Sequence, residues 1–283
     1  MLAALTAALT LAAAQTTTVE AAAVQPIRAS KIVLVGDSTT AVIGGWGPSF
    51  CAYHVTSFAA CVNLARGGRS SGSYIAEGSW NLALAEMATP GFSETYVLIQ
   101  FGHNDQPGKP GRSTDLATGF PANLKRYVTE TRARGATPIL LTPLTRRQFI
   151  DGRLQNDLEP WAEAVRGVAR ETNTPLVDLN RASAETVQAL GPVLSARFAQ
   201  AAPSPEVAAA LLTGTTIAAN TGVPAAPGAP AVAPNNAAVE PLGQARVAFD
   251  YTHLGREGAD FFSALVTRDL IEVAPAMRRL LIP

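Results

Sequence analysis

Four polar clusters of this chain contain the residue types that acyl-transfer chemistry requires. They are Gly36-Asp37-Ser38-Thr39, Gly67-Gly68-Arg69-Ser70-Ser71, Gly102-His103-Asn104-Asp105 and Asp250-Tyr251-Thr252-His253. A serine hydroxyl attacks a carbonyl when an imidazole takes its proton. An aspartate three residues before a histidine can bind the imidazole Nδ1, which leaves Nε2 free to act as that base. We therefore consider Ser38 as a nucleophile, and Asp250 and His253 as its orienting carboxylate and general base.

The two middle clusters can supply hydrogen-bond donors to an oxyanion. The side-chain amide of Asn104 is such a donor, and Gly67 and Gly68 let the backbone turn so that an N–H group points into a site. Taken alone, each cluster is also typical of an ordinary turn, a glycine-rich loop or a helix start. The functional interpretation depends on all four clusters occurring together, and on the elements that position them.

Five short apolar segments predict strands, and amphipathic segments between them predict helices. The strands are expected at 31–35, 61–64, 96–101, 138–141 and 175–178, and the helices at 48–59, 115–134, 158–171 and 256–272. This alternation predicts an α/β fold in which a central five-stranded parallel sheet lies between two layers of helices. Such sheets bind ligands at the carboxyl ends of their strands. The first three clusters directly follow the first three predicted strands, so we expect them to meet at one edge of the sheet.

The composition excludes several other classes of protein. Apolar residues make up 47% of the chain and charged residues 16%, which is typical of a folded domain with a sizeable core. The 22 basic residues balance the 22 acidic residues, which argues against a nucleic-acid partner. Two cysteines and three histidines are too few for a four-cysteine zinc site or a His-rich metal site.

The first residues predict a secretory signal peptide. Residues 2–14 form a short apolar segment, and the small residues at 12–14 and 21–23 are typical of cleavage sites. We expect the segment 1–23 to be removed and the protein to be secreted or periplasmic, with no membrane association after cleavage. The alternative is a disordered N-terminal segment rich in Ala and Thr.

Residues 28–283 are predicted to form a single domain with one insertion. The insertion covers about 196–243, is rich in Ala and Pro, and carries almost no charge. It is predicted to be a loop insertion before the last helix, in which Glu206 to Leu212 could form one or two helical turns. The stretch from Val223 to Pro241 is predicted to be extended (polyproline II-like) or disordered. Two interpretations stay open, namely a flap beside the site and a surface insertion without a functional role.

The four clusters resemble the four sequence blocks of the SGNH (GDSL) hydrolase superfamily. More closely, the chain resembles the rhamnogalacturonan acetylesterases of carbohydrate esterase family 12. The matching stretches are VLVGDSTT, GGWG at 44–47, NLARGGRSSGSY, VLIQFGHNDQ, LTPLTRR and DYTHLGREGA. The resemblance extends from about residue 31 to 190 and resumes at 246, so the predicted insertion departs from the pattern. It implies a flavodoxin-like three-layer α/β/α fold.

The resemblance also implies a site and an activity. Carried over by motif, the site consists of the triad Ser38, Asp250 and His253, with the oxyanion hole formed by Ser38, Gly68 and Asn104. Gly68 is preferred to Gly67 because the family pattern has a glycine directly before Arg-Ser. The implied reaction removes O-acetyl groups from an acetylated polysaccharide or oligosaccharide of the plant cell wall through an acetyl-enzyme. Rhamnogalacturonan (pectin) is the first choice and acetylxylan the near alternative. We expect a monomer that uses no cofactor.

Two other functions remain as alternatives. An SGNH-type lipase or thioesterase would need an apolar acyl channel beside Ser38, which the polar loops at 67–71 and 102–106 do not suggest. A non-catalytic glycan-binding protein on the same scaffold would not need a complete set of catalytic residues. Of the other polar residues, Asp37 and His103 are expected to be structural. Arg69, Arg146 and Arg147 could bind the carboxylates of acidic sugars or form ion pairs within the protein.

The sequence allows two interpretations for Trp46 and two for the pair of cysteines. Trp46 could stack on a sugar ring or pack in the core, and we favour packing. Cys51 and Cys61 could form a disulfide in an oxidising compartment. However, a helix over 48–59 would separate their Cα atoms by roughly 15 Å, whereas a disulfide requires about 7 Å or less. The sequence therefore argues against this disulfide unless the helical segment is shorter.

Overall fold

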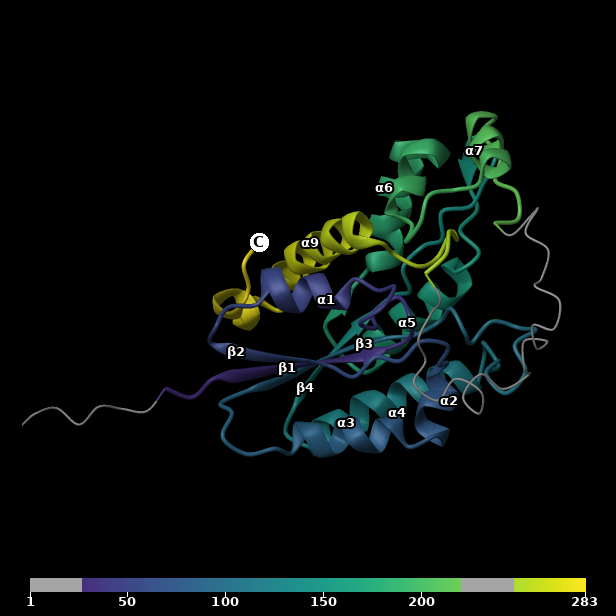
Figure 1. Ribbon diagram of the computed structural model, residues 1–283. Helices are drawn as coiled ribbons and strands as arrows, with labels where there is room; N and C mark the ends of the chain where they lie inside the picture. The colour runs from purple at the N-terminus through teal and green to yellow at the C-terminus, as the bar shows by residue number, and fades with distance from the viewer. Residues whose placement is uncertain (1–26, 220–246) are drawn as a thin grey trace, which may run out of the picture.

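The central feature of the fold is one parallel sheet. The computed structural model describes residues 27–219 and 247–283 (Figure 1). The strands are β1 (Ser30–Gly36), β2 (Ala59–Asn63), β3 (Thr95–Gln100), β4 (Thr137–Leu141) and β7 (Leu176–Val177), in the order β2-β1-β3-β4-β7. All neighbouring pairs are parallel, with Val33 of β1 opposite Val62 on one side and Val97 on the other. This is the flavodoxin-like strand order, and it places all carboxyl ends at one edge.

Both faces of the sheet are covered by helices. Ile32 and Leu34 of β1 belong to a core that includes Phe262 of α9 (Arg256–Val273). The alternate residues, such as Val33, contact the opposite core, which includes Trp80 of α3 (Ser79–Met87). The helices α4 (Gly119–Ala133) and α5 (Glu159–Glu171) complete this second layer. Figure 1 shows α1, α6 and α9 on one side of the sheet and α3 and α4 on the other. The predicted three-layer α/β/α fold with five parallel strands is therefore confirmed.

Several short elements connect the strands, and the sequence did not predict all of them. They are α1 (Gly47–Ser49), η1 (Phe50–His54), α2 (Ser71–Ala76), β5 (Phe149–Ile150), β6 (Arg153–Leu154), α6 (Leu179–Ser195), η2 (Ala196–Phe198), α7 (Pro205–Leu212) and η3 (Pro275–Leu280). The segments α2, α3 and α6 and the β5–β6 hairpin were not expected. In α6, Gly191 has a non-helical φ of 71° and precedes Pro192, and these two residues obscure the helical pattern.

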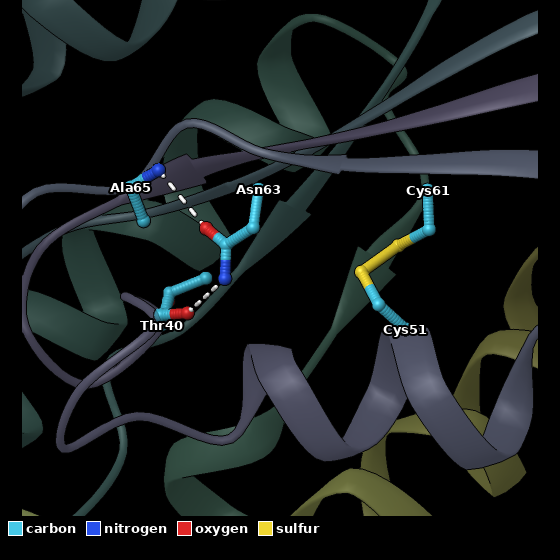
Figure 2. The surroundings of a disulfide bond; sticks show 5 residues. All are labelled: Thr40, Cys51, Cys61, Asn63 and Ala65. Atoms are coloured by element: carbon cyan, nitrogen blue, oxygen red, sulfur yellow. Dashed lines mark hydrogen bonds between the residues drawn. A yellow bond between two sulfur atoms is a disulfide. The ribbon is translucent and has the colours of Figure 1, made fainter.

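The helix predicted at 48–59 is shorter than expected. Helical structure ends at His54, and Val55 is extended and forms an antiparallel bridge with Leu281. The chain then turns back into β2, which brings the Cα atoms of Cys51 and Cys61 to 5.4 Å. The two sulfur atoms form a disulfide that joins η1 to β2 (Figure 2). The argument from helix length against this disulfide is therefore wrong.

The first part of the predicted insertion is folded against the rest of the domain. Phe198 packs on Phe262, with ring centroids 5.3 Å apart, and its carbonyl accepts a hydrogen bond from the Gly255 N–H. Further along, the Tyr251 hydroxyl donates to the carbonyl of Ile217 at 2.8 Å. Residues 196–219 therefore support the segment that contains Asp250 and His253. The remainder of the predicted insertion and the predicted signal segment 1–23 lie outside the described residues.

Within the described ranges, none of the helices combines the length and the apolar composition that a membrane crossing requires.

Candidate active site

Ser38 lies in a tight turn at the carboxyl end of β1. The carboxylate of Asp37 accepts hydrogen bonds from the N–H of Thr39 at 2.9 Å and from its hydroxyl at 2.8 Å. Burial alone would raise the pKa of Asp37, but the adjacent His103 and the bonds from Thr39 lower it below its usual value. Asp37 is thus an ionised, fully buried anchor of the turn, as expected. The side chain of Ser38 is 7% exposed at the protein surface.

His103 is buried beneath the same turn. Its Nδ1 lies 3.4 Å from the second Asp37 oxygen, without the geometry of a hydrogen bond. Burial lowers the pKa of His103, and the charge of Asp37 partly opposes this effect. This agrees with the expected structural role, because the ring is buried beneath the turn and beside Asp37.

Asp250 and His253 form the pair that the sequence predicted. The Nδ1 of His253 donates to Asp250 Oδ2 at 2.7 Å, and the other oxygen accepts from the backbone N–H groups of Thr252 and His253 at 2.7 and 2.6 Å. Burial raises the pKa of Asp250, but these bonds outweigh that effect and lower it to about 2. The carboxylate is therefore ionised at neutral pH. It fixes the proton on Nδ1, so that Nε2 is available as a base.

Arg147 holds the turn that contains this pair. Its guanidinium donates to the carbonyls of Asp250, Thr252 and His253 at 3.0, 3.3 and 2.8 Å. Its own N–H donates to the carbonyl of Tyr251 at 2.9 Å. Burial lowers the pKa of Arg147 to about 10, although the charge of Asp250 partly opposes this. With an exposed fraction of 1%, Arg147 is not accessible to a sugar carboxylate, so of the two interpretations the one within the protein applies to this residue.

The loop after Ser38 reaches the ring of His253. Gly44 has a φ of 90°, and a Cβ at this position would lie 3.1 Å from the Cδ2 atom of His253. The carbonyl of Gly44 also accepts a hydrogen bond from the Leu254 N–H at 2.8 Å. Within the described residues, the Ser38 hydroxyl does not form a hydrogen bond with His253. Catalytic hydrogen bonds are often long in proteins without substrate, so the lack of this bond does not argue against His253 as the base for Ser38.

The predicted oxyanion donors come from adjacent loops. The Nδ2 atom of Asn104 donates to the carbonyl of Arg69 at 3.1 Å, and Asn104 is 7% exposed. Because an amide has two hydrogens, the second can be donated to a substrate oxygen. Gly68 precedes Arg69 in a turn with a φ of 77°. The structure therefore brings the Gly68 loop and Asn104 together, while the preference for Gly68 over Gly67 stays a prediction.

Arg69 and Trp46 are structural residues. Arg69 is 3% exposed, and its Nε donates to the carboxylate of Glu77 at 2.9 Å, so it binds a protein carboxylate rather than an acidic sugar. Trp46 is fully buried, and its Nε1 donates to Oε1 of Gln100 at 2.9 Å. Trp46 therefore packs in the core, as we favoured, and does not stack on a sugar.

Two polar residues that the sequence argument missed connect these loops. Asn63, the last residue of β2, donates to the Thr40 carbonyl at 2.8 Å and accepts from the Ala65 N–H at 3.0 Å (Figure 2). Gln100, the last residue of β3, accepts from the Thr40 hydroxyl and donates to the carbonyl of Thr142 at 3.1 Å. Both fix the segment that follows Ser38. The signal in the sequence was a polar side chain that ends an apolar strand.

The residue types predicted for the site, namely a serine at a strand end, an oriented histidine and amide donors, are those that a serine esterase requires. Among residues 27–219 and 247–283, no group of three or more His, Cys, Asp or Glu side chains is placed to hold a metal ion.

Comparison with known families decides the classification. Residues 34–206, more than half of the chain, match the GDSL-like Lipase/Acylhydrolase family. The chain belongs to this family. The resemblance to this family is thereby confirmed, with the first three clusters inside the matched residues, and the protein is a carboxylic ester hydrolase.

Two relatives from Bacillus subtilis (strain 168) are each 35% identical to this chain. One is named a probable rhamnogalacturonan acetylesterase, YesY, and matches over 158 residues, which are 53% of this chain and 70% of the relative. The other, the rhamnogalacturonan acetylesterase RhgT, matches over 176 residues, or 59% of this chain and 72% of the relative. A crystal structure of the Bacillus subtilis protein YxiM shares the fold, with a TM-score of 0.56 and 21% identity. The match covers 88% of this chain and 58% of that one.

Proposed function

We propose that this protein is a secreted or periplasmic acetylesterase that removes O-acetyl groups from acetylated rhamnogalacturonan. The observation that carries the proposal is the hydrogen bond between Asp250 and His253. The ring of His253 also lies against Gly44, in the loop that continues from Ser38. The names of the two Bacillus subtilis relatives support the substrate class.

The proposed mechanism proceeds through an acetyl-enzyme. His253 takes the proton of the Ser38 hydroxyl, and the serine oxygen forms a bond to the acetyl carbonyl carbon. The Ser38 and Gly68 N–H groups and the Asn104 amide stabilise the resulting oxyanion. The carbon–oxygen bond to the sugar breaks, and His253 gives the proton to the leaving sugar oxygen, which becomes a hydroxyl. Water, activated by the same histidine, then hydrolyses the acetyl-enzyme and releases acetate.

The disulfide supports the proposed location. Disulfides such as Cys51–Cys61 persist in secreted and periplasmic proteins, whereas the reducing cytosol keeps most thiols free. The experiment is expression of the full chain in a host that secretes it, followed by mass analysis of the protein in each fraction. Recovery of a shortened, disulfide-bonded protein outside the cytoplasm is expected. A full-length, reduced protein that stays in the cytoplasm would contradict this location.

A lipase function has less support from the structure. An apolar cavity of about 590 Å³ lies between α6, η2 and α7, with Ala208 and Leu211 in its lining. Its lining includes neither Ser38 nor Asn104, so it does not form an acyl channel beside the nucleophile.

Acetate release from a panel of substrates tests the proposed function. The panel contains acetylated rhamnogalacturonan, acetylated homogalacturonan, acetylxylan and a long-chain p-nitrophenyl ester, with Ser38→Ala as the inactive control. We expect the highest kcat/KM on acetylated rhamnogalacturonan. Faster release from acetylxylan, or a preference for the long-chain ester, would refute the proposed substrate.

A further inference from the structure

Three cationic side chains surround the predicted oxyanion loops, and none has a role in the mechanism above. Lys109 Nζ donates to the carbonyl of His103, the neighbour of Asn104. Arg112 Nη1 donates to the carbonyl of Gly68 at 3.4 Å. The third cation, Arg146, lies at the other side of the site, where its Nε donates to the Thr252 hydroxyl at 3.2 Å, between Asp250 and His253. We call Lys109, Arg112 and Arg146 the rim cluster.

The rim cluster carries more positive charge than its surroundings neutralise. Arg146 forms an ion pair with Asp157. Neither Lys109 nor Arg112 forms an ion pair with a carboxylate in the part of the chain that the structure describes. The Nε atom of Arg112 is also buried and has no hydrogen-bond partner. Lys109 and Arg112 are therefore held beside the site without an ion pair to a described carboxylate.

The charges of Arg146 and Arg112 both act on Lys109. Burial is the main cause that lowers the pKa of Lys109 to about 8, and the positive charges of Arg146 and Arg112 lower it further. Asp37 and Asp157 act in the opposite direction but do not cancel the effect. Because the repulsion between charges falls with distance, cations that perturb one another in this way can face the same ligand. Like charges held together at a site are typical of a binding site for an ion of opposite sign.

We propose that the rim cluster binds the carboxylate of a uronic acid residue of the substrate, on the sugar that carries the ester or on its neighbour. This inference rests on the proposed function, since it names the groups that would recognise an acidic polysaccharide at the same site. A guanidinium and an ammonium together bind a carboxylate through charge-assisted hydrogen bonds. A neutral acetylated sugar has no group that would compensate the charge of Lys109 and Arg112. The rim cluster would therefore select acidic polysaccharides over neutral ones.

Direct binding of an unacetylated ligand tests the rim cluster separately from catalysis. The probe is trigalacturonate, titrated by calorimetry into the full chain with Ser38→Ala, and its fully methyl-esterified form is the neutral control ligand. We expect trigalacturonate to bind at least tenfold more tightly than the methyl ester, and the difference to shrink as NaCl is raised. Adding Lys109→Gln and Arg112→Gln together should weaken trigalacturonate binding at least tenfold and leave methyl-ester binding as it was.

Arg134→Gln in the same Ser38→Ala background is the matched control variant. Arg134 is exposed, makes no ion pair among the described residues, and lies between α4 and β4, at the opposite end of the sheet from the site. Its replacement removes one positive charge without touching the rim cluster, so trigalacturonate binding should not change. The variant Lys109→Arg, which retains the charge, should restore most of the affinity that Lys109→Gln loses. Thermal unfolding of each variant checks that the fold is intact.

Three results would overturn the inference. They are equal binding of trigalacturonate and its methyl ester, unchanged trigalacturonate binding in the double variant, and a loss in Arg134→Gln as large as that in the double variant. The acetate-release panel distinguishes failure of the rim cluster from failure of the proposed function. A protein that deacetylates rhamnogalacturonan but binds both probes equally retains the proposed function and refutes only the rim cluster. A protein that prefers trigalacturonate but releases no acetate from rhamnogalacturonan refutes the proposed substrate alone.

Discussion

Removal of the Cys51–Cys61 disulfide should lower the stability of the fold by an amount that the loop length determines. The two cysteines are 10 residues apart in sequence. For a closed loop of that size, the chain-entropy description gives about 9 cal/mol/K of lost denatured-state entropy, or about 2.7 kcal/mol at 25 °C. In a domain of this size, such a change lowers the thermal midpoint by about 5–10 °C.

The assay is urea unfolding of Cys51→Ala/Cys61→Ala beside the oxidised wild type. Wild type treated with dithiothreitol should lose the same free energy of unfolding as the double variant, and the reductant should have no effect on the variant itself. Neither cysteine contacts the site residues, so kcat on p-nitrophenyl acetate should stay within about twofold at temperatures well below the midpoint. A loss under about 1 kcal/mol would refute the reasoning, since it would mean that the loop is already restricted in the reduced, unfolded chain.

Further predictions concern the site. Ser38→Ala should lower kcat by about 10⁶, and a serine-directed phosphonate should label Ser38 in peptide mass analysis; a label on another serine would contradict the assignment. Asn104→Ala should lower kcat about 10²–10³-fold with little change in KM, because an oxyanion donor acts mainly in the transition state. An unchanged kcat, with a lower unfolding midpoint in the same preparation, would make Asn104 a purely structural residue. Asp250→Asn should lower kcat by about 10⁴, because an amide would hold the wrong imidazole tautomer. Steady-state rates on p-nitrophenyl acetate measure this change. A loss of less than tenfold would exclude Asp250 as the orienting group. Lys109, whose pKa is about 8, is charged below that pH and neutral above it. Trigalacturonate binding to the Ser38→Ala protein should therefore weaken as pH rises through about 8, and Lys109→Arg should remove this dependence. Binding that does not change with pH in the Ser38→Ala protein would count against a role of Lys109.

The sequence predicted the sheet and the placement of the first three polar clusters because both depend on local patterns. The run from Lys31 to Val35 is apolar and β-branched, and the structure extends it by only one residue at each end, to Ser30–Gly36. The polar residues that follow such a strand lie at the carboxyl edge of any parallel sheet. Ser38 and Asn104 could therefore be assigned to one edge without knowledge of the packing.

Features that depend on distant contacts were not predictable from local patterns. The helix ends at His54 rather than at residue 59 because pairing of Ala59 with Ser30 draws the chain back to the sheet. That reversal also brings Cys51 to Cys61. Arg147 binds carbonyls more than 100 residues later in the chain, so no spacing rule could have distinguished it from its neighbour Arg146.

The same long-range contacts determine when the chain becomes able to react. The turn that contains Asp250 and His253 is held by Arg147, by the carbonyl of Gly44 and by the carbonyl of Phe198, all of them distant in sequence. Contacts of such high sequence separation close large loops, which places them late in folding. A nascent chain can therefore expose its serine for some time while it still has no base to activate it. We therefore expect hydrolytic competence to be among the last properties that the folding chain acquires.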